Sequence, residues 1–519
     1  NINFMKNKLF IFLFSLIVIF LGAKAQNINV TLLRWMRPQG SRADTYNEWM
    51  LSHPNSQMII SSIYNSQNKR DSYKSIAILT ANNIAPYLET EINQLTEYLE
   101  NEGYDVHNYI VNGGTPEDLK LFLQQLYSDY QIEGALFIGD LPVAWYQIEN
   151  DYNEYGYAEW PIDYYFMDLD GLWSDNLVPA SDSLIYGTDG IYDTHTGNIE
   201  PEIYIARLMP TGIGDDVSLL KNYFSKDFEY RSQNNAIEHR ALVYVDDDWE
   251  PWSYDYAYEV TLLYPDTYLT YDINETRATD YRQDLDSSWA WVSVFAHSWP
   301  GGHSFYYNDR TQTDFYYSTE YTNQDPDVNF YNFFACSFAR YTQNGYGAGS
   351  AIFNQDYSLG ALGSTKTGSM LNAVYLYTSL AQGKTLGEAY KDWFYTITSD
   401  GISFDELCWF YGMTLLGDPT LKPLGQNVNL IDYNTNKLLV SVYPNPTNGI
   451  INLKINDPNL NDVSIEITDI MGRTINKFTK DCHNAMCEET IDLSNLTNGI
   501  YFLKLSNNTK YSFIKLLKQ

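Results

Sequence analysis

The alternation of short apolar runs with helical segments is the feature that most limits the fold of this chain. Three runs have the length and composition of buried strands: SIAILT (75–80), DVHNYIV (105–111) and GALFIGD (134–140). Between them, residues 85–102 and 115–126 place leucines at helical spacing, and the second segment opens with a Thr-Pro capping signal. This order predicts a parallel sheet whose faces are covered by helices.

A second set of strand-length apolar runs follows residue 240. Its members are ALVYVDDDW (241–249), WVSVFAHS (291–298), YNFFACS (331–337) and SLGALGST (358–365). The first three end in residues capable of chemistry, and ligands of open α/β sheets bind at the carboxyl ends of strands. We therefore expect a functional site there. Residues 141–205, rich in Tyr, Trp, Asp and Gly, show little periodicity and are expected to form ordered loops.

The C-terminal part changes character. Residues 435–519 alternate apolar and polar residues, with Pro, Asn and Gly at the turns. This pattern is typical of a small antiparallel sandwich resembling an immunoglobulin domain. We place the boundary between Gly417 and Lys437, which gives an α/β domain over 71–425 and an all-β domain over 435–519.

The N-terminus has the pattern of an export signal. A basic start precedes the uncharged run LFIFLFSLIVIFLG, and small residues precede Gln26. The run is shorter than the ~18 residues of a membrane-spanning helix. We expect a signal peptide over 1–25 with translation starting at Met5, no transmembrane span in the mature chain, and an N-terminal segment or propeptide over 26–70. RWMRPQGSR (34–42) offers cleavage sites within that segment.

Charge and cysteine usage exclude several classes of protein. The net charge of −33 argues against a nucleic-acid partner, because phosphate neutralisation needs clustered Lys and Arg. Four cysteines in a chain of 519 residues make no disulfide scaffold, and their spacing matches no zinc signature. Cys482 and Cys487 are close enough in sequence to bridge. Cys336 and Cys408 are then either paired or free.

Two of the strand ends together predict nucleophilic catalysis. His297 closes one apolar run and Cys336 closes the next, and a thiol needs a neighbouring base to become a nucleophile. Alone, each is an ordinary buried or structural residue. From the end of the preceding run, a carboxylate of Asp246, Asp247 or Asp248 could orient the imidazole, unless the acidic run is only a solvated turn. The backbone amides of Ser298 and Cys336 are the expected oxyanion donors.

The order of motifs around these residues resembles a known family. VFAHSWPGG, then FFACSFARYTQNGYGAGSAIF, GALGST and LLGDPTL resemble the gingipain-type cysteine peptidases, relatives of caspases and legumain. FIGDLP, WPIDYYFMDLDG and EIYIARL resemble the first subdomain of that family. The resemblance spans about 75–425 and implies a caspase-like sheet with flanking helices in two subdomains. It also implies His297 as base, Cys336 as nucleophile, and Asp246 or Asp247 as the orienting carboxylate.

The chain departs from this family at one position beside the base. The family has Gly after the catalytic His, whereas Ser298 stands here, and a side chain restricts the backbone conformation of an oxyanion donor. His303, in GGHSF, is therefore a rival base. We favour His297 because it ends an apolar run and so lies on rigid scaffold. Gingipain relatives select basic substrate residues through a pocket carboxylate, and the sequence identifies no such pocket residue here.

The tail resembles a second family. YPNPTNG, ITDIMGR and LSNLTNGIYFLKL, over about 435–519, resemble the C-terminal sorting domain of type IX secretion. This resemblance implies export through the periplasm and across an outer membrane, with the secretion machinery as partner, and then release or anchoring at the cell surface. The alternative is an ordinary adhesive β-sandwich.

An acidic stretch supplies hard oxygen ligands of the kind that calcium takes. These ligands are Asp168, Asp170, Asp175, Asp189 and Asp193, with glycine turns between them. The spacing is not that of an EF-hand, and the alternative is an acidic surface loop. We expect calcium here only as a structural ion, and no cofactor for catalysis.

Two functions fit the sequence as a whole. The first is a secreted cysteine endopeptidase that acts on protein or peptide substrates through an acyl-enzyme on Cys336. The second is a catalytically inactive surface protein of the same fold that binds a glycan or a protein with its Tyr- and Trp-rich loops.

Overall fold

The computed structural model describes most of the chain. The described residues are 42–65, 74–180, 183–234, 237–273, 276–308, 310–399, 401–424, 439–456, 462–469, 474–482, 486–507 and 511–518. The expected signal peptide, the start at Met5 and residues 425–437 of the expected boundary region lie outside these ranges. Within the described ranges, no helix combines the length and the apolar character that a membrane crossing needs.

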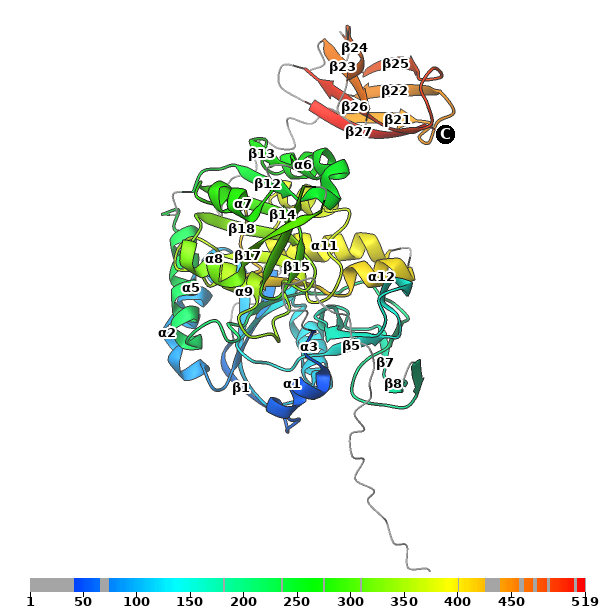
Figure 1. Ribbon diagram of the computed structural model, residues 1–519. Coiled ribbons are helices and arrows are strands. Elements are labelled where there is room, and N and C mark those ends of the chain that lie inside the picture. The colour runs from blue at the N-terminus through cyan, green and yellow to red at the C-terminus, as the bar shows by residue number, and fades with distance from the viewer. Residues whose placement is uncertain are drawn as a thin grey trace, which may run out of the picture.

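One large mixed sheet forms the centre of the first domain (Figure 1). Its strands, in spatial order, are β1 (Ile59–Asn65), β3 (Tyr104–Asn112), β2 (Lys74–Ala81), β4 (Gly134–Ile138), β11 (Tyr204–Leu208), β20 (Met413–Gly417), β19 (Gly360–Ser364), β18 (Val328–Phe334), β14 (Trp289–Phe295), β12 (Ala241–Val245) and β13 (Thr267–Thr270). Both predicted sets of strands are confirmed, and β11 and β20 join them into a single sheet. Two pairs are antiparallel, β1 with β3 and β19 with β20.

Helices cover both sides of this sheet, with α2 and α5 on the left of Figure 1 and α11 and α12 on the right. The helices are α1 (Tyr46–Ser52), α2 (Glu89–Asn101), α3 (Pro116–Tyr130), α4 (Tyr164–Met167), α5 (Asp216–Arg231), α6 (Ser253–Thr261), α7 (Ala278–Leu285), α8 (Ser318–Gln324), α9 (Gly347–Ile352), α10 (Val374–Ala381), α11 (Leu386–Thr398) and α12 (Phe404–Phe410). Short 3₁₀ turns cover Ala85–Tyr87, Asp151–Asn153 and Asp247–Trp252.

Local sequence explains where these elements begin and what they bury. Thr115 caps α3 in a capping box with Asp118, and Pro116 occupies the first turn, as the sequence predicts. All residues of β12, β14 and β18 are buried, which accounts for their continuous apolar runs. The aromatic-rich stretch 141–205 is more regular than predicted. It contains the short strands β5 (Trp145–Ile148), β6 (Ala158–Pro161), β7 (Leu172–Ser174), β8 (Leu177–Ala180), β9 (Ser183–Tyr186) and β10 (Thr194–Thr196).

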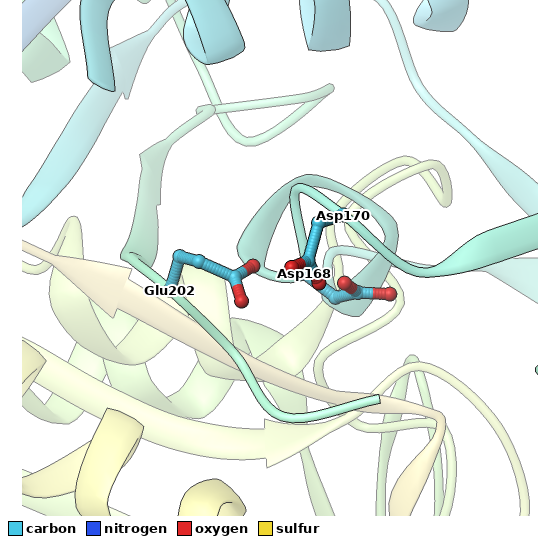
Figure 2. A group of neighbouring side chains, drawn as sticks. All are labelled: Asp168, Asp170 and Glu202. Carbon is cyan, nitrogen blue, oxygen red and sulfur yellow. The ribbon is translucent and has the colours of Figure 1, made fainter. Parts of the chain in front are cut away.

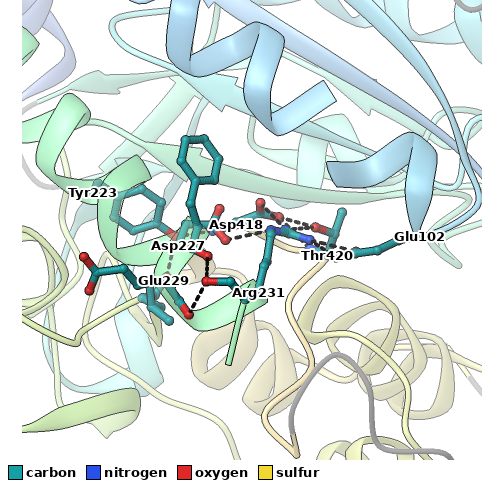
Figure 3. A network of polar contacts seen from close by, with 10 residues as sticks. Glu102, Tyr223, Asp227, Glu229, Arg231, Asp418 and Thr420 are labelled. Atoms are coloured by element: carbon teal, nitrogen blue, oxygen red, sulfur yellow. Dashed lines mark hydrogen bonds and ion pairs between the residues drawn. The ribbon is translucent and has the colours of Figure 1, made fainter. Parts of the chain in front are cut away.

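A buried polar network ties the end of α5 to the loop after β20 (Figure 3). Arg231 donates to Asp227 at 2.7 Å, to Asp418 at 2.8 Å and to Glu102 at 2.7 Å. Its Nη2 also bonds Thr420 at 2.7 Å. Because a buried guanidinium needs charged and hydrogen-bonded partners, the LLGDPTL motif serves here to hold the fold together.

The C-terminal region is a separate all-β unit with its own core. One sheet pairs β21 (Leu439–Tyr443), β22 (Ile450–Asn456) and β25 (Met486–Asp492). The other pairs β24 (Thr474–Lys480), β23 (Val463–Asp469), β26 (Gly499–Ser506) and β27 (Tyr511–Lys518). Of the two possibilities that the sequence left open for each pair, Cys482 and Cys487 form a disulfide, and Cys336 and Cys408 are free.

Candidate active site

Three neighbouring parallel strands end at one edge of the sheet. Val245 of β12 pairs with Phe295 of β14, and Phe295 pairs with Phe334 of β18. The line continues one residue further, where the Ala296 N–H donates to the Phe334 carbonyl at 3.2 Å. His297 lies two residues after Phe295, and Cys336 lies two residues after Phe334. The sheet register therefore brings them to adjacent positions at the carboxyl edge, as the sequence predicts.

His297 is paired with a carboxylate. Its Nε2 lies 2.5 Å from Oδ2 of Asp248, whose Oδ1 lies 2.8 Å from Nη1 of Arg310. A carboxylate can only accept a hydrogen bond, so in the neutral imidazole the proton is on Nε2 and Nδ1 is free to accept one. The hydrogen bond from His297, with the nearby Arg310 charge, lowers the pKa of Asp248.

Aromatic rings hold the imidazole on two sides. The Trp249 ring lies 4.7 Å from the His297 ring, and the Tyr306 ring meets it edge-on at 5.3 Å. Trp249 also contacts Phe334 at the end of the cysteine-bearing strand, with 5.9 Å between the ring centroids. The His297 ring is therefore held by packing as well as by its carboxylate partner.

The pairing carboxylate, Asp248, differs from Asp246 and Asp247, the two that the family resemblance implies. Asp246 is fully buried, accepts the Tyr306 N–H at 3.1 Å, and has its pKa raised by burial to about 8. Burial also raises the pKa of Asp247. Asp246 still continues the pairing between β12 and β14, because its N–H donates to the Phe295 carbonyl. Asp248 lies instead in the 3₁₀ turn that starts at Asp247. That turn, and not the strand, sets which carboxylate meets His297.

Cys336 is a free cysteine in a tight turn after β18, and the residue as a whole is partly exposed. Burial raises its pKa, while a hydrogen bond from the Gly368 backbone and the charge of Lys366 act in the opposite direction. The next residue, Ser337, has a φ of 58°, and its N–H donates to the Lys366 carbonyl at 2.8 Å. A non-glycine residue at positive φ beside a reactive group is strain of the kind that functional sites hold.

Ser298 lies in a short strand that follows β14. It belongs to β15 (His297–Trp299), which pairs with β16 (Gly302–Tyr307), and β16 in turn pairs with β17 (Gln312–Tyr317). Its hydroxyl donates to the Ala296 carbonyl at 3.1 Å. Oxyanion binding by the backbone amides of Ser298 and Cys336 stays a prediction.

His303, the rival base, is a core residue. It is fully buried, and its Nδ1 lies 2.7 Å from the Ser298 hydroxyl while its Nε2 lies 3.0 Å from the Tyr321 hydroxyl. Burial lowers its pKa to about 3, so the ring is neutral. Both nitrogens therefore have structural partners, and Ser298, which replaces the family glycine, is one of them.

The five aspartates of the acidic stretch fall into two groups. Asp168 and Asp170 lie beside Glu202, with ligand oxygens of all three within 4.8 Å of one another (Figure 2). Protein donors already engage Asp168: the Gly171 N–H at 2.7 Å and His195 at 2.6 Å. Burial raises the pKa of Glu202 to about 7. Calcium binding at this cluster stays a prediction.

The cluster also has a cation from the chain itself. The buried Lys120 ammonium lies 4.5 Å from the Tyr165 ring centre and 5.5 Å from that of Trp173. Burial lowers its pKa to about 8, and the charges of Asp168, Glu202 and Asp170 oppose that shift. Part of the negative charge is thus balanced without a metal ion.

The remaining three aspartates accept hydrogen bonds from backbone N–H groups of the same stretch. Asp175 accepts the Gly190 N–H at 2.8 Å, Asp189 accepts the Ile191 N–H at 3.0 Å, and Asp193 accepts the Leu177 N–H at 2.7 Å. They do not join the group in Figure 2. Glu202, which does, had no signal in the sequence, because it lies more than 30 residues from Asp168.

Comparisons with known proteins assign a family to each of the two parts of the chain. The family model described as peptidase family C25 matches residues 69–424, and the secretion system C-terminal sorting domain matches residues 441–519. A comparison with curated proteins gave no match.

Among solved structures, the chain is similar to a DUF3244 family protein with an immunoglobulin-like β-sandwich fold from Bacteroides vulgatus. The identity is 18%, the match covers 17% of this chain and 89% of that one, and the TM-score is 0.15.

The mixed sheet with flanking helices and the β-sandwich tail are those that the two resemblances imply. The C-terminal match assigns export by type IX secretion, to the cell surface or the medium. Because the C25 match covers more than half of the residues, the chain belongs to peptidase family C25, the gingipain family of cysteine peptidases.

Proposed function

We propose that the protein is a secreted endopeptidase in which Cys336 is the nucleophile, His297 the base and Asp248 the orienting carboxylate. The observation that carries this is the Nε2 contact of His297 with Asp248, made at the strand end beside that of Cys336. It supports a base whose free nitrogen is Nδ1. A nucleophile, a base and an oriented carboxylate on adjacent strand ends are the parts that covalent peptide hydrolysis requires.

The reaction takes the proton of the thiol before the sulfur attacks. His297 Nδ1 accepts the Cys336 proton, and the sulfur adds to the peptide carbonyl carbon to give a tetrahedral oxyanion. The C–N bond then breaks as the imidazolium returns the proton to the leaving amine. Water, deprotonated by the same imidazole, hydrolyses the thioester and restores the thiol.

The environment of the thiol favours general-base activation over a resident thiolate. Burial raises the pKa of Cys336, so the sulfur is protonated at neutral pH, while the Gly368 amide and Lys366 are placed to stabilise charge as it develops. Asp248 stabilises the imidazolium that forms at the same moment.

Alkylation of the folded, unreduced protein tests the nucleophile. Cys336 is partly exposed, whereas Cys408 is fully buried, its sulfur lies 3.4 Å from the Tyr152 amide, and burial raises its pKa to about 11. We expect iodoacetamide to label Cys336 at least about tenfold faster than Cys408. The thiol is protonated at neutral pH, so the labelling rate should rise as the pH is raised and the thiolate forms. Peptide mass spectrometry reads both sites in one sample.

The control for this experiment is His297→Ala, which should slow labelling at Cys336 and leave Cys408 unchanged. Equally slow labelling of both cysteines in a folded sample would contradict the assignment of Cys336 as nucleophile.

Replacing Asp248 tests its role as the carboxylate that orients His297. Asp248→Asn removes the charge that accepts the Nε2–H hydrogen bond of His297. We expect kcat/KM to fall by roughly 10- to 100-fold, which is less than the ~10²- to 10⁴-fold that a general base contributes. The acidic limb of the pH–rate profile should also move. Asp247→Asn is the matched control, with an expected change within about threefold. An equal or larger loss in Asp247→Asn would show that the wrong carboxylate has been assigned.

A further inference from the structure

A residue from the N-terminal segment is bound beside the candidate nucleophile. Asp44 lies upstream of α1, and its Oδ1 is 2.5 Å from Nε of Arg340, the residue four positions after Cys336. Nη2 of the same guanidinium donates to the Asp44 backbone carbonyl at 2.9 Å. Arg340 therefore binds both the side chain and the main chain of Asp44, and the contact with the carboxylate is charge-assisted.

The charge of Arg340 is balanced from outside the peptidase domain. Its side chain is 2% exposed, and its remaining bonds go to the backbone carbonyls of Thr365 at 3.0 Å and Glu159 at 3.1 Å. Among the described residues, Asp44 is the one carboxylate in ion-pair contact with it. Residue 44 precedes the C25 match, which starts at 69. The domain thus holds a buried cation whose counter-charge comes from a flanking segment.

This ion pair borders a small cavity whose wall includes the residue that follows Cys336 in the chain. The cavity has a volume of about 30 Å³, and its walls include Asp44, Arg340, Ser337, Lys366 and Thr367. Ser337 follows Cys336 directly, and the loop at Lys366 leads to Gly368, whose backbone bonds the sulfur. The second cation of the cavity, Lys366, already has a partner in Asp151 at 2.9 Å. Arg340 is accordingly the group that a further anion would meet.

From this geometry we infer that the cavity beside Cys336 is a subsite for an acidic substrate side chain, anchored by Arg340 and filled in this chain by Asp44. The inference rests on the proposed peptidase function and names its substrate class. The carbonyl of Asp44 is held by Arg340 itself, so the segment is bound in a register that blocks the subsite without presenting that carbonyl for attack.

Neighbouring contacts keep the segment in place. The Tyr46 N–H donates to the Glu159 carboxylate at 2.8 Å, and Trp49 of α1 is buried in the core. A carboxylate tethered in this way competes with substrate at high effective concentration. Removal of the Asp44 side chain should therefore open the subsite while the rest of the segment stays docked.

The experiment compares an anionic and a neutral alkylating reagent on the full-length chain. Asp44→Ala should raise the ratio of iodoacetate to iodoacetamide labelling rates at Cys336 by about fivefold or more, because the unmatched Arg340 charge attracts the anion. Glu48→Gln is the matched control, since it removes a charge from the same segment but keeps an oxygen for the Thr45 N–H, and it should leave the ratio unchanged.

Two further variants test whether Arg340 is the group that attracts the anion. In the Asp44→Ala chain, adding Arg340→Gln should return the ratio to that of the parent. If the double variant does not fold, Asp44→Glu serves instead, since it keeps the negative charge and should leave the ratio close to the parent value. An unchanged ratio in Asp44→Ala would overturn the inference.

Peptide hydrolysis separates this inference from the proposed function. With matched peptides that carry Asp or Asn beside the scissile bond, Asp44→Ala should increase hydrolysis of the Asp peptide at least about fivefold over the Asn peptide. A raised labelling ratio without hydrolysis of any peptide supports the anionic subsite and contradicts the peptidase function. Hydrolysis with no preference between the two peptides sustains the peptidase and overturns the acidic subsite.

Discussion

Replacing Cys336 with alanine is expected to abolish peptide hydrolysis, with a loss of at least about 10⁴-fold in kcat. The covalent step needs a nucleophile at the carboxyl edge of β18, and no other thiol of the described chain is placed there. Cys408 is fully buried in α12, and Cys482 and Cys487 are joined in the tail. Hydrolysis of an internally quenched peptide by purified full-length protein measures the effect.

Cys408→Ala is the control for this change. The Cys408 side chain bonds the Tyr152 amide and the Asp151 carboxylate, so this variant should keep activity after a modest loss of stability. Activity that survives in Cys336→Ala but disappears in a folded Cys408→Ala sample would contradict the assigned nucleophile.

Replacing His297 with alanine is expected to lower kcat/KM by about 10²- to 10⁴-fold, because both thiol deprotonation and protonation of the leaving amine depend on this ring. The variant should fold, since His297 is partly exposed and its main polar contact, Asp248, is also partly exposed. The pH–rate profile of the parent should show a limb that the variant lacks.

His303→Asn is the discriminating comparison. His303 is neutral and buried between Ser298 and Tyr321, so its replacement should lower the melting temperature while the folded fraction keeps most of its kcat/KM. If His303→Asn removes activity from a folded sample and His297→Ala retains it, the base has been assigned to the wrong histidine.

The sequence by itself determined the strands and the placement of His297 and Cys336 at neighbouring strand ends. Continuous apolar runs fix β12, β14 and β18, because strands buried on both faces admit few polar residues. Parallel strands of one sheet end at one edge, so the ends of the runs at His297 and Cys336 were enough to place these residues together. The cysteine pair of the tail was also readable, since only a few residues separate its members.

Only the tertiary structure decided which neighbours complete the site. A run of three aspartates contains no signal for which carboxylate meets His297; the 3₁₀ turn after Asp246 selects Asp248 and leaves Asp246 buried. His303 bonds the hydroxyl of Tyr321, which comes from α8. The contact between Asp44 and Arg340 joins residues nearly 300 positions apart. Strand and turn preferences are local and can be read along the chain, whereas these contacts arise only when distant segments pack together.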